Sequence, residues 1–406
     1  MSAPGPLPPP LPSAAAQEAT APLEFAPPTL FPRRSRTRRA LSMLGRNLLG
    51  MFAVQSILGA LMALGWTARS MQREGHKVWA RGSGLKDWPE ALDAVPALRP
   101  WAHWPTWLRA PAQEPEAPTG KTGRARAWLR RHLGGVPQHL KTGAQMLFNT
   151  AVLVLPATAM MQFAWYDGWN NSFNKGYEQA FVGPLISVFA ILGFIAAMFH
   201  VPFAQARQAL SGDWRRFYDF RLIRKLVRRA WLSSATLAAA YALLCVPLTV
   251  IRSLPTFFPQ FNAHLPSYTE PQRIHLLNQY FFFTAAVFFP IFVSLHLRAA
   301  RAYAAALLSA AQSGAVSEGD LAKSEWRMMN TLGLLRPRAP EDPPAWKRAA
   351  RWFATRTGQA AAVILVFLCW FLVIGQVYVG EFFLYHPRTG FLNHPVILLP
   401  LHHSLP

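Results

Sequence analysis

Acidic residues are scarce in this chain, and several long segments contain no charged residue at all. The 406 residues include 19 Asp and Glu against 41 Lys and Arg. Hydrophobic residues make up 52% of the chain and charged residues only 15%. Charge gathered in blocks between uncharged hydrophobic segments is typical of a polytopic membrane protein, and it argues against an ordinary soluble globular protein of this length.

The shortage of acidic residues leaves a net charge of +22, which in a soluble protein would indicate nucleic-acid binding. Here the basic residues flank hydrophobic segments, where they meet anionic lipid headgroups. We therefore expect the lipid bilayer with its anionic headgroups to be a partner, together with other proteins, and we expect no nucleic acid.

Cysteine is also scarce, and catalytic signatures are missing. Cys245 and Cys369 both fall in predicted membrane segments, which excludes a disulfide framework and a cysteine-based zinc site. The chain has no phosphate-binding loop, no His-Glu-x-x-His and no Gly-x-Ser-x-Gly. We predict no cofactor, no metal and no catalytic residue. Clustered histidines are the weaker alternative for a metal site, namely His386, His394, His402 and His403.

Uncharged hydrophobic segments dominate what the chain does contain. Residues 143–164 and 181–203 flank a short polar insert, and each can cross a bilayer core of ~30 Å at about 1.5 Å rise per residue. Similar segments occur at 48–66, 230–251, 279–297 and 359–379. The sequence predicts an all-α integral membrane protein with about six transmembrane helices and cytoplasmic amphipathic helices.

The chain divides by composition. Residues 1–40 are rich in proline and arginine, and we expect a disordered tail. Residues 41–66 hold the first hydrophobic segment, and residues 67–142 are basic, rich in Trp and extramembrane. The membrane domain covers 143–379, and an extracytoplasmic tail covers 380–406.

Positive charge predicts the orientation. Residues 205–229 and 298–357 carry eight and ten Lys or Arg, whereas residues 252–278 carry two. The positive-inside rule places the first two regions in the cytoplasm. Residues 67–142, with 13 Lys and Arg, belong there as well. The segment 48–66 conflicts with this arrangement, because six arginines precede it; it either spans the membrane or re-enters on the cytoplasmic side.

Two extramembrane helices are predicted. At 100° per residue, residues 219–229 separate into a basic face and an apolar face, which indicates an amphipathic helix lying along cytoplasmic headgroups. The predicted headgroup contacts are Arg221, Arg224, Lys225 and Arg228. Further along, Ser317 and Asp320 match a capping box that opens a helix ending near Gly333.

The polar insert at residues 166–180 holds the remaining candidate site. It contains Asp167, Asn170, Asn171, Asn174, Lys175 and Glu178 among several aromatic residues. We interpret it as a structural turn anchored by aromatics at the membrane interface. The alternative is a catalytic pair, Asp167 and Glu178, sharing one pocket.

Aromatic and proline residues leave further alternatives. We expect Trp101, Trp104 and Trp107 to lie at a membrane interface rather than in a ligand site. Prolines interrupt three predicted spans, at Pro156, Pro247 and Pro290. They either line a cavity or mark ordinary helix contacts.

These patterns predict a non-enzymatic membrane protein, an envelope component that acts through protein or lipid partners. The alternative is a transporter or permease subunit for a neutral substrate, with a separate ATPase. A lipid-modifying or intramembrane enzyme is the third interpretation. High Arg over Lys content suggests a bacterial protein of the cytoplasmic (inner) membrane.

Overall fold

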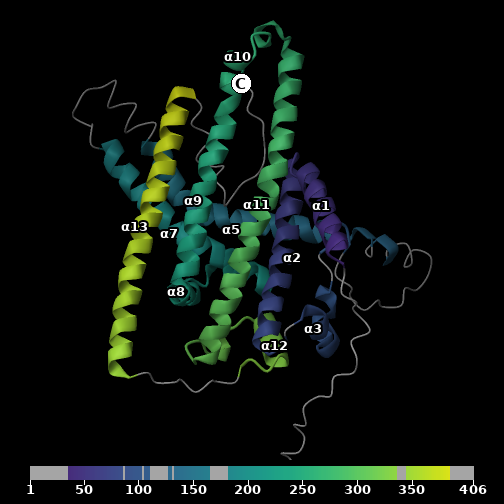
Figure 1. The fold of residues 1–406 in the computed structure, drawn as a ribbon, viewed down its shortest axis with the longest axis vertical. Coiled ribbons are helices and arrows are strands. Elements are labelled where there is room, and N and C mark those ends of the chain that lie inside the picture. The colour runs from purple at the N-terminus through teal and green to yellow at the C-terminus, as the bar shows by residue number, and fades with distance from the viewer. Residues whose placement is uncertain are drawn as a thin grey trace, which may run out of the picture.

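In a computed structural model, every regular element of the described residues is a helix (Figure 1). The structure describes residues 35–85, 87–102, 105–109, 127–129, 132–164, 182–335 and 344–384. The predicted all-helical class is confirmed for this part of the chain.

Four described helices are long and apolar enough to cross a membrane. They are α5 (Gly135–Phe163), α7 (Val182–Ser211), α11 (Glu270–Gln312) and α13 (Ala345–Leu384). A fifth helix, α9 (Trp231–Ser253), is apolar over the shorter stretch Trp231–Leu244. In Figure 1, α9, α11 and α13 run along the long axis of the molecule, and α5 and α7 pass behind α9 and α11.

Helix α2 (Ile57–Gly82) packs against α5, α7 and α11. Two of its side chains, Trp66 and Trp79, are fully buried. The indole N–H of Trp66 donates to the carbonyl of Pro105 (2.8 Å), and that of Trp79 donates to the carbonyl of Ala304 in α11 (3.1 Å). A buried Trp needs such an acceptor for its polar N–H, so both indoles have fixed positions.

The residues 67–142 that we expected outside the membrane contribute to this core. Trp107 is only 5% exposed and stacks on Trp66, with ring centroids 4.7 Å apart. The ring of Trp101 contacts that of His76. The prediction of an interfacial position is therefore wrong for Trp107, which packs inside the protein; Trp104 lies outside the described residues.

The first hydrophobic segment, residues 48–66, is not one helix. Helix α1 (Arg36–Ala53) ends, and α2 begins at Ile57 after the N-cap Ser56, whose hydroxyl accepts from the N–H of Gly59. Phe52 of α1 contacts Phe282 of α11 edge to face, and Trp66 of α2 approaches Phe289. Both helices thus contact the same part of α11, and α11 continues well beyond their junction (Figure 1).

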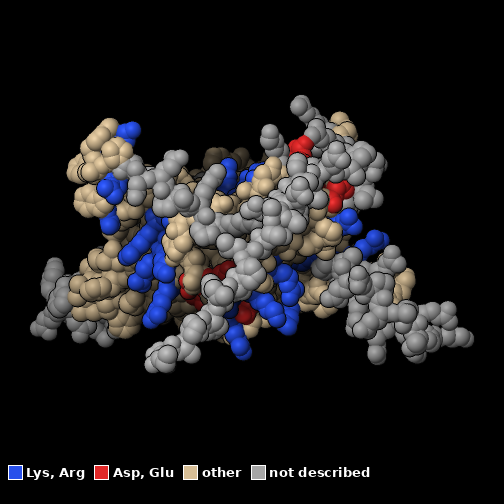
Figure 2. Space-filling model, turned by 90° about the horizontal axis from the view of Figure 1, so that it is seen from below, with Lys and Arg blue, Asp and Glu red and all other residues tan. Residues whose placement is uncertain are grey.

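The basic regions lie at one end of the bundle. Helix α8 (Phe220–Arg229), helix α12 (Lys323–Thr331) and the start of α13 share this end, whereas the connector with α10 (Phe258–Phe261) lies at the opposite end (Figure 1). Viewed from this end, Lys and Arg side chains surround a small acidic area (Figure 2). The capping box at Ser317 and Asp320 is present, and Gly333 has a φ of +64°, just after α12.

Candidate functional site

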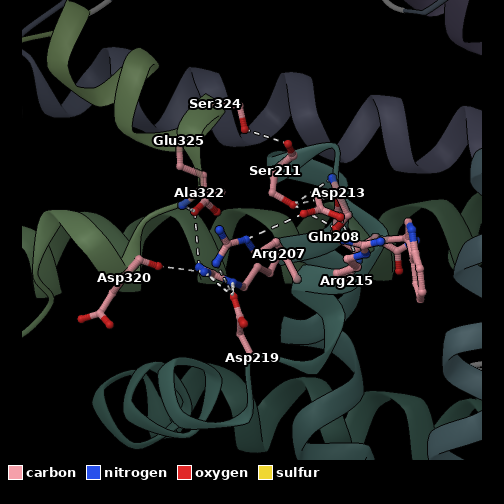
Figure 3. Close-up of polar contacts among 12 residues, drawn as sticks. Arg207, Gln208, Ser211, Asp213, Arg215, Asp219, Asp320, Ala322, Ser324 and Glu325 are labelled. Carbon is pink, nitrogen blue, oxygen red and sulfur yellow. Dashed lines mark hydrogen bonds and ion pairs between the residues drawn. The ribbon is translucent and has the colours of Figure 1, made fainter.

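A buried arginine organises the polar contacts at the basic end. Arg207 lies near the end of α7 and is fully buried. Its Nε and Nη2 donate to Oδ2 of Asp219, which is the residue before α8, at 2.8 and 2.6 Å. Nη1 donates to the hydroxyl of Tyr303 on α11 (3.0 Å), and Nη2 also donates to the carbonyl of Asp320 (2.9 Å). All three guanidinium nitrogens therefore have acceptors (Figure 3).

Glu325 of α12 is the second buried charge of this group. Its Oε2 lies 3.3 Å from Nη1 of Arg207 and accepts from the backbone N–H of Ala322 (2.9 Å). Its Oε1 accepts from the hydroxyl of Tyr303 (2.7 Å). Burial raises the pKa of Glu325, while Arg207, Tyr303 and the Ala322 N–H oppose that rise. The Arg207 guanidinium and the Ala322 N–H can only donate, so these two contacts favour the ionised carboxylate.

We define the arginine cluster as Arg207, Asp219, Tyr303 and Glu325. Its buried charged groups pair with one another through ion pairs and hydrogen bonds. One buried cation faces two carboxylates, and Arg216 supplies a further cation 3.3 Å from Asp219. A buried ionised group is tolerated only when it is paired in this way. The effect of the cluster is to hold α7, α8, α11 and α12 together.

A second polar group joins α5 to α7 nearby. The side-chain amide of Asn149 donates to Oε1 of Gln208 (3.1 Å) and to the carbonyl of Trp214 (2.9 Å). The hydroxyl of Tyr218 donates to Oδ1 of Asn149 (3.1 Å). These contacts fix the turn that follows α7, so Asn149 stabilises helix packing, which is the role expected of polar residues in membrane helices.

A third polar contact fixes α2 to α11. Oε2 of Glu74 lies 3.2 Å from Nε of Arg301, and Oε1 accepts from Lys77 at 2.7 Å. Burial by itself would raise the pKa of Glu74, but Lys77, Arg301 and Arg73 together hold it below its ordinary value. Glu74 is therefore ionised at neutral pH and pairs two helices at the basic end.

The predicted site residues fall into two groups. The polar insert lies outside the described residues, and so do its candidates Asp167, Asn170, Asn171, Asn174, Lys175 and Glu178. The predicted basic helix is present as α8, and its four cations Arg221, Arg224, Lys225 and Arg228 are exposed.

The apolar face of α8 does not face lipid. Leu222, Ile223 and Leu226 are buried at 5% exposure or less, in the core shared with α7 and α11. The apolar face of the predicted amphipathic helix is thus covered by protein. Contact between its exposed cations and headgroups stays a prediction.

The span prolines do not converge on one cavity. Pro156 and Pro247 are exposed, and Pro290 is half-buried. The polar residues of the spans also separate, since Asn149 belongs to the contacts described above, whereas Tyr241 and His296 lie around a different core. The described residues contain no group of three or more His, Cys, Asp or Glu that could hold a metal ion.

No known protein family, curated protein or solved structure matches this chain.

Proposed function

We propose that this chain is a non-enzymatic multi-pass protein of a bacterial cytoplasmic membrane, which presents a rigid basic surface to anionic lipids and partner proteins. The observation that carries the proposal is the arginine cluster. The buried charges of the basic end neutralise one another, while the cations of α8 point outward. A surface of this kind attracts anionic partners without chemistry.

The path of α1 and α2 supports a cytoplasmic position for the basic end. If the two helices form a re-entrant hairpin, the arginines that precede residue 48, four of which belong to α1, lie on the same side of the membrane as those of α2. The six arginines that precede residue 48 then no longer need to lie outside, so the conflict with the positive-inside rule disappears. Residues 252–278, with two basic residues, lie on the outer side.

Single cysteines test this orientation. In a protein with Cys245→Ser and Cys369→Ser, we expect an impermeant maleimide to label Ser267→Cys in intact cells. We expect Ser35→Cys and Ser324→Cys to react only after the cells are permeabilised. All three serines are exposed. Labelling of position 35 from outside would show that the first segment crosses the membrane, and labelling of position 324 would reverse the whole topology.

A transporter for a neutral substrate is the second candidate, and one observation favours it. The hydroxyl groups of Tyr241 and Ser234 and Nε2 of His296 are buried, and none has a hydrogen-bond partner among the described residues. The rings of Tyr241 and His296 are 6.2 Å apart. Buried polar atoms of this kind are normally hydrogen-bonded, and water is the usual partner, so the pair marks a place where a polar path can enter the bundle.

Hydroxyl-radical footprinting tests this second candidate. Radicals form from water, so a side chain beside bound water is modified faster than a dry one. Tyr303 is the matched control, because it is equally buried but is hydrogen-bonded to Arg207 and Glu325. We expect Tyr241 to be modified several-fold faster than Tyr303 in detergent-solubilised protein. Equal rates would mean that Tyr241 is dry, and the transporter interpretation would lose its support.

A further inference from the structure

A groove of about 830 Å³ lies between the junction of α8 and α9 and the first half of α13. One wall carries Arg228 and Trp231, and the other carries Arg348, Trp352 and Arg356. Arg356 lies over the ring of Trp352, with 5.9 Å between its guanidinium carbon and the ring centroid. The two walls belong to helices far apart in sequence, so the groove exists only in the folded protein.

The described side chains that line the groove include three cations and no carboxylate. No carboxylate of the described residues forms an ion pair with Arg228, Arg348 or Arg356, whereas Arg207 and Arg216 each pair with two and Arg301 pairs with one. Three guanidinium groups on one groove repel each other, and an anion between them would remove that repulsion. Guanidinium is also the side-chain group that best fits a phosphate, because it donates two parallel hydrogen bonds.

The groove also has an apolar part. Phe199, Ala235, Ala362 and Val363 line it, and beyond them the outward face of α13 continues with exposed Ile364 and Leu365. On one wall Trp231 lies between Arg228 and Ala235, and on the other Trp352 lies between Arg348 and Arg356. Amphipathic indole rings beside cations are typical of the membrane interface. The same groove therefore offers cations at one end and a hydrocarbon surface at the other. A soluble anion would use only the first of these features.

We infer that this groove binds one anionic phospholipid. The phosphate lies among Arg228, Arg348 and Arg356, and an acyl chain lies along Ala235 and Val363. This inference rests on the proposed function, because it assigns a particular lipid site to the basic end. It differs from diffuse attraction by the exposed face of α8, since a groove built from two helices selects both the headgroup charge and the acyl chain.

Native mass spectrometry of the full-length protein in detergent tests the site, with phosphatidylglycerol as the probe and phosphatidylcholine as the neutral comparison. The groove variant is Arg228→Gln, Arg348→Gln and Arg356→Gln together. The control variant removes the same charge from the exposed face of α8, by Arg221→Gln, Arg224→Gln and Lys225→Gln. We expect phosphatidylglycerol affinity to fall at least tenfold in the groove variant and less than threefold in the control, with phosphatidylcholine binding unchanged in both.

Two further measurements distinguish the phosphate of a lipid headgroup from free inorganic phosphate. Val363→Gln should weaken binding of long-chain phosphatidylglycerol several-fold but leave a short-chain soluble form unaffected. Millimolar inorganic phosphate should not compete with the long-chain lipid. Equal losses in the groove and control variants, or full competition by inorganic phosphate, would overturn the inference. Unchanged melting temperature of each variant shows that the protein is folded. The test uses purified protein and does not depend on orientation in cells. A reversed topology in cells would therefore contradict the proposed function, and the lipid affinity of the groove could still be measured.

Discussion

Arg207→Met is expected to lower the free energy of unfolding by about 3–5 kcal/mol, the range found when one partner of a buried ion pair is removed. The substitution keeps most of the side-chain volume but leaves Glu325 as a fully buried carboxylate without a cation. Tyr303 and the N–H of Ala322 still donate to it, but they cannot replace the charge. The native state of a protein is stabilised by only about 5–15 kcal/mol, so we expect a large drop in folded yield.

Arg216→Gln is the matched control. Arg216 also pairs with Asp219, at 3.3 Å, but its side chain is 36% exposed. A solvent-exposed pair contributes at most about 1 kcal/mol. Thermal unfolding in detergent, followed by size-exclusion chromatography, measures both variants. If Arg207→Met lowered the melting temperature no more than Arg216→Gln, the arginine cluster would not be what holds the basic end together.

A double variant separates the pair from the rest of the cluster. Glu325→Leu alone leaves Arg207 with Asp219 as its only carboxylate, so it should also be strongly destabilising. Arg207→Met with Glu325→Leu removes both buried charges, and we expect it to cost less than the sum of the single variants. Simple additivity would indicate that the two side chains do not interact in the folded protein.

The sequence predicted the helix at residues 219–229 but not its neighbour. At 100° per residue, helix geometry alone places Arg224 on the opposite face of the helix from Leu222 and Leu226. That pattern is the same whether the apolar face meets lipid or protein, so burial against α7 and α11 was not readable from it. Only the spatial neighbours decide which surface covers the leucines.

Arg207 itself was missed, although a signal for its burial exists. It is one of eight basic residues in the region 205–229, and counting charge treats all eight alike. Ala206, Ala209 and Leu210 nevertheless continue the apolar character of α7 around Arg207, which indicates a helix buried on every side. Its partners could not be found in the same way, because Tyr303 and Glu325 lie 96 and 118 residues further along the chain.

The first hydrophobic segment shows how a length rule can mislead. Nineteen uncharged residues fit a span, but the N-cap Ser56 divides them into two helices. The arginines on both flanks were the sequence signal against a simple crossing. Their conflict with the positive-inside rule raised the re-entrant alternative, and the break between α1 and α2 is the observation on which we propose it.

The close crossing of α2 and α5 leads to the second large effect. At Gly65, an added Cβ would lie 1.9 Å from the backbone oxygen of His139; at Gly143, it would lie 1.8 Å from that of Leu61. Both contacts are with backbone atoms, which cannot rotate away as a side chain can. The two helices approach this closely because each presents a glycine, the arrangement that small residues allow in membrane bundles.

We expect Gly65→Ala and Gly143→Ala each to destabilise the protein by about 1–3 kcal/mol or more, because α2 and α5 must move apart to admit one methyl group. Once they have moved, the second methyl costs little, so the double variant should lose less than the sum. Gly193→Ala in α7 and Gly45→Ala in α1 are the controls. Their added Cβ atoms meet nothing closer than 3.7 Å, and Ala favours a helix over Gly by roughly 0.5–1 kcal/mol. Melting temperatures should therefore fall for positions 65 and 143 and hold or rise for 193 and 45; a fall of equal size at all four would show that the crossing is looser than these contacts require.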